Sequence, residues 1–147
     1  MKSILIAATA LCALSAPTFA APAKHFPGAP NAAYSAAVQL GDTLYISGTA
    51  DGRDPDTGKP PVDATTGAKV VMNIVKKILE SAGYTMDDLV WVQIFTTDLK
   101  YYGDFNAVYR TFFKGPLPAR AFIGAGSLLG DAHFEVMGMA VKGSAAR

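Results

Sequence analysis

Residues 89–95 read Leu-Val-Trp-Val-Gln-Ile-Phe, and residues 134–141 read Phe-Glu-Val-Met-Gly-Met-Ala-Val. The β-branched and aromatic residues of these segments are typical of strands. Because side chains alternate between the two faces of a strand, each segment would be apolar on both faces. One face of residues 89–95 carries Leu89, Trp91 and Phe95, and the other face carries Val90, Val92 and Ile94. An apolar sheet face of this size needs a cover, so we expect a homo-oligomer whose sheets bury one another.

The sequence around these strands predicts one α+β domain in which two helices cover one face of a small mixed sheet. Asp63 is placed to cap the first helix, and Gly83 to end it. The expected order is strands at 36–40 and 43–47, a helix from about 65 to 83, a strand at 89–97, a helix at 101–113, and strands at 121–125 and 132–141.

The first twenty residues have the pattern of a secretory signal peptide. Lys2 gives a positive start, residues 4–14 are apolar except for Thr9 and Cys12, and Ala20 ends a small-residue cleavage site. A membrane anchor is the alternative, but the apolar segment spans about 16 Å as a helix, against ~30 Å of bilayer core. We therefore expect a periplasmic or secreted protein with no membrane association after cleavage.

Cleavage divides the chain into a signal at residues 1–20 and a single domain at residues 21–147, too short for two domains. The 147 residues are 50% hydrophobic and 17% charged, which is a globular composition. Thirteen Lys and Arg balance twelve Asp and Glu, so the chain lacks the basic excess that a nucleic-acid partner requires. The one cysteine excludes an internal disulfide framework.

Weaker motifs do not support a metal or a cofactor. The glycines of residues 124–130 approach a dinucleotide-binding spacing, but the last interval is one residue too long and leads into a strand. His133 is isolated and is expected to be an exposed strand residue. A loop with three aspartates resembles a calcium site without its flanking helices, which favours a solvated acidic loop at Asp51, Asp54 and Asp56.

Arg120 and Glu135 are the best candidates for chemistry, because arginine and glutamate are rare in this chain. Arg120 opens one terminal strand and Glu135 lies on the next, so pairing of those strands would bring both side chains to one cleft. An arginine offers a planar fork for a substrate carboxylate, and a glutamate can orient or activate a water. A structural salt bridge explains the same pair, and composition alone favours it.

A series of short motifs carries more information than any single residue. They are Ala-Tyr-Ser-Ala-Ala-Val (33–38), Leu-Tyr-Ile-Ser-Gly (44–48), Asn-Ile-Val (73–75), Ile-Leu-Glu-Ser-Ala-Gly (78–83), Asp-Leu (98–99), Phe-Asn-Ala-Val-Tyr (105–109), Phe-Phe (112–113), Pro-Ala-Arg (118–120) and Phe-Glu-Val (134–136). In this order and spacing, residues 28–142 resemble the Rid family, the reactive intermediate deaminases also called the YjgF family. The resemblance implies a chorismate-mutase-like α+β fold, assembled as a homotrimer with a central barrel of sheets and with sites in clefts between subunits.

The resemblance also implies a reaction and a site. Arg120 matches the arginine that binds the substrate carboxylate, and Glu135 the acidic residue that helps to orient the attacking water. The other implied substrate-binding positions are Tyr34 from the neighbouring subunit, Gly48, Asn106 and Phe122, the last of which often is a cysteine in well-known members. The implied reaction hydrolyses enamine or imine intermediates, such as 2-aminoacrylate, to a 2-keto acid and ammonia without a metal or cofactor.

A second function remains open at this point. The same clefts would serve a non-catalytic trimer that binds small ligands or acts as a chaperone. Arg120 together with Glu135 favours the enzyme, whereas the signal segment and Phe122 favour the binding protein. The RNA cleavage sometimes attributed to this family finds little support in the balanced charge.

Overall fold

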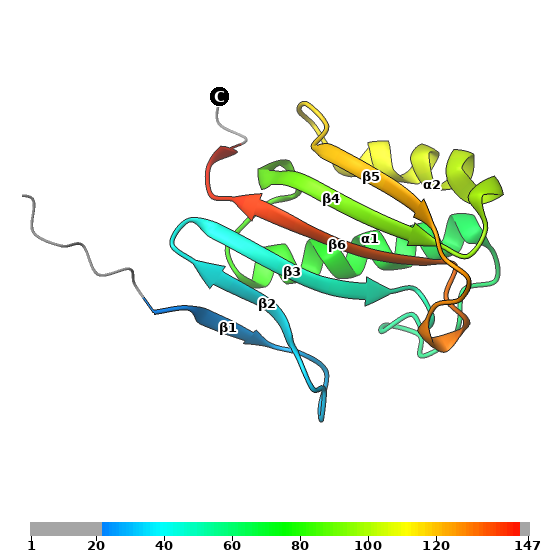
Figure 1. The fold of residues 1–147 in the computed structure, drawn as a ribbon, viewed down its shortest axis with the longest axis horizontal. Coiled ribbons are helices and arrows are strands. Elements are labelled where there is room, and N and C mark those ends of the chain that lie inside the picture. The colour runs from blue at the N-terminus through cyan, green and yellow to red at the C-terminus, as the bar shows by residue number, and fades with distance from the viewer. Residues whose placement is uncertain (1–21, 145–147) are drawn as a thin grey trace, which may run out of the picture.

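The part of the chain that the structure describes forms a six-stranded sheet with two helices packed on one face (Figure 1). The computed structural model describes residues 22–144, so the signal segment expected at residues 1–20 lies outside the described residues. The strands are β1 (Lys24–Pro27), β2 (Ser35–Leu40), β3 (Thr43–Ala50), β4 (Leu89–Thr96), β5 (Ala119–Gly124) and β6 (Phe134–Val141), and the helices are α1 (Ala64–Ser81) and α2 (Tyr102–Tyr109). The expected α+β class is confirmed.

The sheet order is β1-β2-β3-β6-β4-β5, antiparallel throughout except for the parallel pair β4 and β5. The last two strands do not pair, because β4 lies between β5 and β6, so the condition for a cleft shared by Arg120 and Glu135 within one chain is not met. The physical reason is the connection through α2, since a helix crossover returns the chain to a parallel neighbour. The extended segment before residue 33 also contains β1, which adds an edge strand beside β2.

Helix α1 begins and ends close to the predicted residues. The Asp63 side chain accepts a 2.7 Å hydrogen bond from the backbone N–H of Thr66, which caps the helix. Gly83 follows the helix with φ +79°, a conformation that glycine adopts without strain. The second predicted helix is divided, because short 3-10 turns at Leu99–Tyr101 and Arg110–Phe112 flank α2.

The core lies between the helices and one face of the sheet. Val92, Ile94, Phe134 and Val136 face the helices and are at most 1% exposed. A bulge in β4 between Leu89 and Trp91 alters the predicted alternation, because it turns Leu89 into this core and leaves Val90 36% exposed. The predicted faces are thus correct from Trp91 onward and reversed for the two residues before it.

The opposite face of the sheet has no covering element among residues 22–144, as Figure 1 shows. Strand pairing places apolar side chains across neighbouring strands on this face, namely Tyr45, Trp91, Phe95, Ile123, Met137 and Met139. Tyr45 is 47% exposed and Ile123 is 40% exposed. The two-faced apolar character inferred from the strand sequences is therefore a property of the folded chain. None of the helices in this described part is long and apolar enough to cross a membrane.

Candidate functional site

The predicted site residues form two groups on opposite faces of the sheet. Arg120 lies beside Val92 in the register of β5 and β4, and therefore faces the helices. Glu135 lies beside Phe95, on the uncovered face. The two side chains of one chain thus point away from each other, and the ion pairs among the described residues do not join them. This arrangement contradicts both a structural salt bridge and a shared cleft within one chain.

Aromatic rings surround the guanidinium group of Arg120. Its central carbon lies 4.7 Å from the ring centroid of Tyr109 and 5.7 Å from those of Tyr102 and Phe122. Cation–π attraction to these rings holds the side chain on the helix face of the sheet. Phe122 itself packs edge-on against Tyr102 and Phe105, at centroid distances of 5.1 and 5.6 Å. Phe122 therefore supports the arginine from β5.

Asn106 joins this group from α2. It lies one helical turn after Tyr102, and its side chain hydrogen-bonds the phenol of Tyr102, which lowers the pKa of Tyr102. The positive charge of Arg120 lowers the same pKa further. A cavity of about 130 Å³ opens beside these groups, lined by Asn106, Tyr109, Arg110, Leu117, Pro118 and Arg120. The region offers cationic and amide donors and suits a small anion. We call these six residues the Arg120 pocket.

The second group surrounds Glu135 in a wide cleft of about 1240 Å³. Strand β3 bulges between Ile46 and Thr49, so that Gly48 faces the Glu135 carboxylate. A Cβ atom at Gly48 would overlap the Oε1 atom of Glu135, so glycine is required for this approach. Tyr34, 58% exposed, lines the same cleft. We call this region the Glu135 cleft; it contains Tyr34, Gly48 and Glu135.

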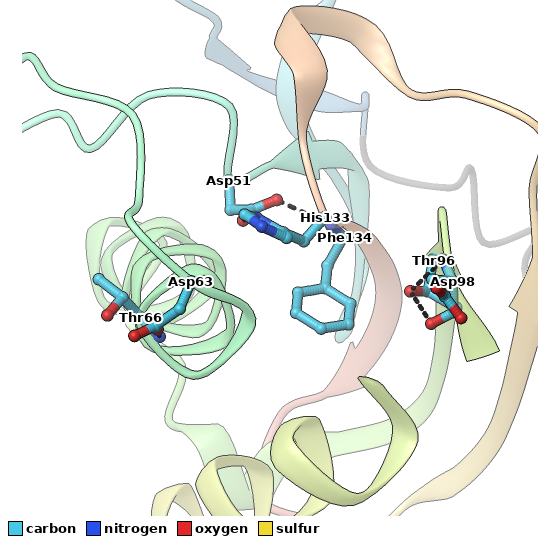
Figure 2. A network of polar contacts seen from close by, with 7 residues as sticks. All are labelled: Asp51, Asp63, Thr66, Thr96, Asp98, His133 and Phe134. Atoms are coloured by element: carbon cyan, nitrogen blue, oxygen red, sulfur yellow. Dashed lines mark hydrogen bonds and ion pairs between the residues drawn. The ribbon is translucent and has the colours of Figure 1, made fainter. Parts of the chain in front are cut away.

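A buried carboxylate at the edge of this cleft was not anticipated from the sequence. Asp51 is fully buried, accepts a 2.7 Å hydrogen bond from the backbone N–H of Phe134, and lies 3.0 Å from Nδ1 of His133 (Figure 2). The expectations of a solvated Asp51 and an exposed His133 are therefore wrong. A Cβ atom at Gly67 would overlap the Asp51 carboxylate, so a glycine inside the first turn of α1 was the available signal.

The Asp51 contacts join the end of β3 to the start of β6. Gly48 lies three residues before Asp51 in the chain, and Glu135 directly follows Phe134. The hydrogen bond between Asp51 and Phe134 thus fixes the two backbones that bring Gly48 and Glu135 together. Within residues 22–144, no group of three or more His, Cys, Asp or Glu side chains is arranged to hold a metal ion.

The architecture and the known proteins that share it define the class of protein. The E. coli protein TdcF, solved with bound serine, matches with a TM-score of 0.73 at 30% sequence identity, covering 80% of this chain and 94% of that chain. The fold is chorismate-mutase-like.

The family follows from the sequence comparison. A model of the Endoribonuclease L-PSP family matches residues 25–142. The chain belongs to this family, which is the Rid or YjgF family that its motifs resemble.

Two curated relatives indicate the range of names within the family. The 2-iminobutanoate/2-iminopropanoate deaminase of Mus musculus is 35% identical over 111 residues, which cover 75% of this chain and 82% of that protein. A RutC family protein of Sulfurisphaera tokodaii is 33% identical over 112 residues, covering 75% of this chain and 88% of that protein. The family therefore includes imine deaminases as well as members named only by family.

Proposed function

We propose that this protein hydrolyses 2-imino and 2-enamino acids to 2-keto acids and ammonia, at sites shared between two chains of a homotrimer. The observation that carries the proposal is the placement of Arg120 and Glu135 on opposite faces of one sheet. In a 2-imino acid, the carboxylate and the imine carbon are directly bonded. If Arg120 binds the carboxylate and Glu135 acts at the imine carbon, the two residues of one site must therefore come from different chains.

The uncovered sheet face supports assembly of this kind. It carries apolar side chains such as Trp91 and Met139, which gain free energy when removed from water. A closed ring of three chains repeats one heterologous interface three times, so each chain supplies one half of two sites. In this arrangement, the Arg120 pocket of one chain faces the Glu135 cleft of the next, together with Tyr34 of that chain.

The reaction requires positioning and two proton transfers, because both protons of the water end on the nitrogen. Arg120 binds the carboxylate through its fork, and Glu135 holds a water against the electrophilic imine carbon. As the carbon–oxygen bond forms, the water gives one proton to the Glu135 carboxylate. Glu135 returns this proton to the nitrogen, which gives a carbinolamine. Glu135 then takes the hydroxyl proton and passes it to the amino nitrogen, so the carbon–nitrogen bond breaks as the carbonyl forms and ammonia leaves. The products are a 2-keto acid and ammonia, with atoms and charge conserved.

The relatives add support at the level of the family. A mouse relative is named for 2-iminobutanoate and 2-iminopropanoate, and TdcF was solved with serine, which also carries an α-carboxylate. The retention of Arg120 favours the enzyme over a non-catalytic binding trimer. A trimer that binds 2-oxobutanoate tightly and yet turns over no imino acid would establish the binding protein instead.

Subunit complementation tests the shared site directly. Arg120→Ala and Glu135→Gln are purified separately, unfolded together in equal amounts, refolded and assayed for keto-acid release from enzymatically generated 2-aminoacrylate. At substrate concentrations below KM, each variant alone should retain at most about a tenth of wild-type activity. The mixture should recover about a quarter of wild-type activity, because each mixed trimer regains one of its three sites. No recovery, with trimers present by light scattering, would contradict a site shared between chains.

We also propose that the protein is exported, on the signal pattern of residues 1–20. Fractionation of producing cells and N-terminal sequencing test this. The expected result is a periplasmic or secreted chain that begins near residue 21, and an intact Met1 on a cytoplasmic protein would contradict it.

A further inference from the structure

A second arginine lines the Arg120 pocket. Arg110 directly follows α2, is exposed to solvent, and lines this pocket together with the half-buried Arg120. Within residues 22–144, no Asp or Glu side chain lines the pocket, and neither arginine belongs to an ion pair. Arg53, the other arginine of this part of the chain, donates a hydrogen bond to the Gly58 carbonyl instead. The pocket therefore concentrates positive charge that the described chain does not neutralise.

The spacing along α2 brings the second arginine to this position. Tyr102, Asn106 and Arg110 follow one another at intervals of four residues, and the backbone at Arg110 is still helical, so the three share one face. The hydrogen bond with Asn106 is the main cause of the lowered pKa of Tyr102, and the charges of Arg120 and, less strongly, Arg110 lower this pKa further. Both guanidinium groups therefore act on the same small region beside β5.

The charge of the pocket indicates the charge of its ligand. Two like charges at one small pocket repel each other, and a bound anion offsets this repulsion. A monocarboxylate on Arg120 would neutralise one charge and leave Arg110 without a partner. A second carboxylate on the same molecule would supply that partner, because the planar fork of an arginine matches a carboxylate. The pocket volume of about 130 Å³ restricts such a ligand to a short dicarboxylate.

We propose that Arg110 is a specificity-determining residue that binds the distal carboxylate of a short 2-imino dicarboxylic acid, while Arg120 binds the carboxylate next to the imine carbon. The inference rests on the proposed function for the reaction, and adds the class of substrate that this chain prefers. Such imino acids have the carbon skeletons of aspartate and glutamate. Monocarboxylic imino acids remain substrates, with weaker binding.

Two keto acids separate the contribution of Arg110 from that of Arg120. The probes are 2-oxoglutarate, which has a distal carboxylate, and 2-oxobutanoate, which has none, each titrated by calorimetry into the assembled protein. Wild-type protein should bind 2-oxoglutarate about tenfold more tightly, the effect of one further charge-assisted contact. Arg110→Gln should weaken the binding of 2-oxoglutarate by about the same factor, and that of 2-oxobutanoate much less. Absence of the preference in wild type, or equal losses for both acids in Arg110→Gln, would overturn the proposal.

Two further variants separate the fork from the charge. Lys76→Gln is the matched control, because it removes one positive charge from an exposed position on α1 outside the Arg120 pocket. It should keep the wild-type preference, and an equal loss of preference in Lys76→Gln would overturn the proposal by reducing the effect to net charge. Arg110→Lys keeps the charge without the fork, so it should retain only part of the preference.

A structural role for Arg110 has a different signature. If Arg110 pairs with a carboxylate of another chain, Arg110→Gln should weaken assembly, as measured by light scattering, and keep the preference for 2-oxoglutarate, which would overturn the proposal. Failure of the deaminase function is also distinguishable. In that case wild-type protein would still prefer 2-oxoglutarate in binding and Arg110→Gln would lose this preference, whereas neither protein would turn over any imino acid.

Discussion

The Arg120 pocket and the Glu135 cleft are built in contrasting ways. The pocket is small, about 130 Å³, and its walls come from a regular helix, a regular strand and the segment that joins them. The cleft is nearly ten times larger and is formed by the bulged strand β3, by Glu135 of β6 and by three loops, and the buried Asp51 fixes one edge of it. In the proposed reaction, the pocket selects an anion by rigid packing, whereas the cleft orients a water through backbone irregularity.

The largest effect is expected at the centre of the cleft. Glu135→Gln keeps the shape of the side chain and cannot accept a proton, so the single-turnover rate at saturating substrate should fall about a hundred- to ten-thousandfold. The affinity for 2-oxobutanoate should change little. Glu80→Gln is the control, because Glu80 is the other glutamate and its side chain is 57% exposed on α1. An unchanged rate in a folded Glu135→Gln trimer would remove Glu135 from the mechanism.

Substitution of Arg120 in the pocket should mainly weaken the binding of substrate. Arg120→Ala should lower kcat/KM about ten- to a hundredfold, the loss of a charge-assisted contact, with most of the change in KM. Arg120→Lys should fail in the same way, because an ammonium cannot reproduce the fork or its packing against the rings. Steady-state kinetics and circular dichroism check both variants. Wild-type rates in both would make Arg120 structural and would remove the deaminase proposal.

A smaller effect is expected where the bulge meets the carboxylate. Gly48→Ala places a methyl group where the Glu135 carboxylate lies, so kcat should fall about tenfold as the carboxylate is displaced. Gly103→Ala is the control, since a Cβ atom at Gly103 would meet nothing within 4 Å. Equal kcat in the two variants would contradict the geometry of the cleft.

The smallest effect concerns the support of the cleft. His133→Asn removes one hydrogen bond to Asp51 and leaves the bond from the Phe134 N–H, so the free energy of unfolding should fall by about 1 kcal/mol. His25→Asn, which removes an exposed contact with Ser35, should have less effect. Urea unfolding measures both. A larger loss for His25→Asn would show that the Asp51 contact does not stabilise this edge.

The sequence predicted local features and the two faces of each strand better than it predicted which strands lie next to one another. The Asp63 cap, the Gly83 end and the apolar faces of β4 and β6 follow from spacing along the chain. The order of the strands in the sheet cannot be derived in this way, because a strand has the same alternation of apolar residues whether its neighbour is parallel or antiparallel. The position of β5 matters most, since only its pairing with β6 would have placed Arg120 and Glu135 on one side.

The remaining errors came from partners distant in sequence. Asp51 reads as solvated because its neighbours are loop residues, and its burial depends on Phe134, 83 residues later. The bulge beside Gly48 has no separate sequence signature, and only its contact with Glu135 explains the glycine. Arg120 and Glu135 were identified through their rarity in the chain and through the family resemblance.

The Asp51–Phe134 hydrogen bond also has a consequence for the order of folding. It closes a loop of 83 residues, whereas Tyr109 and Arg120 are close along the chain. Because closure of a longer loop costs more entropy, the region around Tyr109 should form early and the region around Asp51 late. Mutations in α2 should then slow folding, and mutations at Asp51 should mainly speed unfolding. Stopped-flow chevrons of Phe105→Leu and Asp51→Asn measure the difference, and equal φ-values would exclude this order.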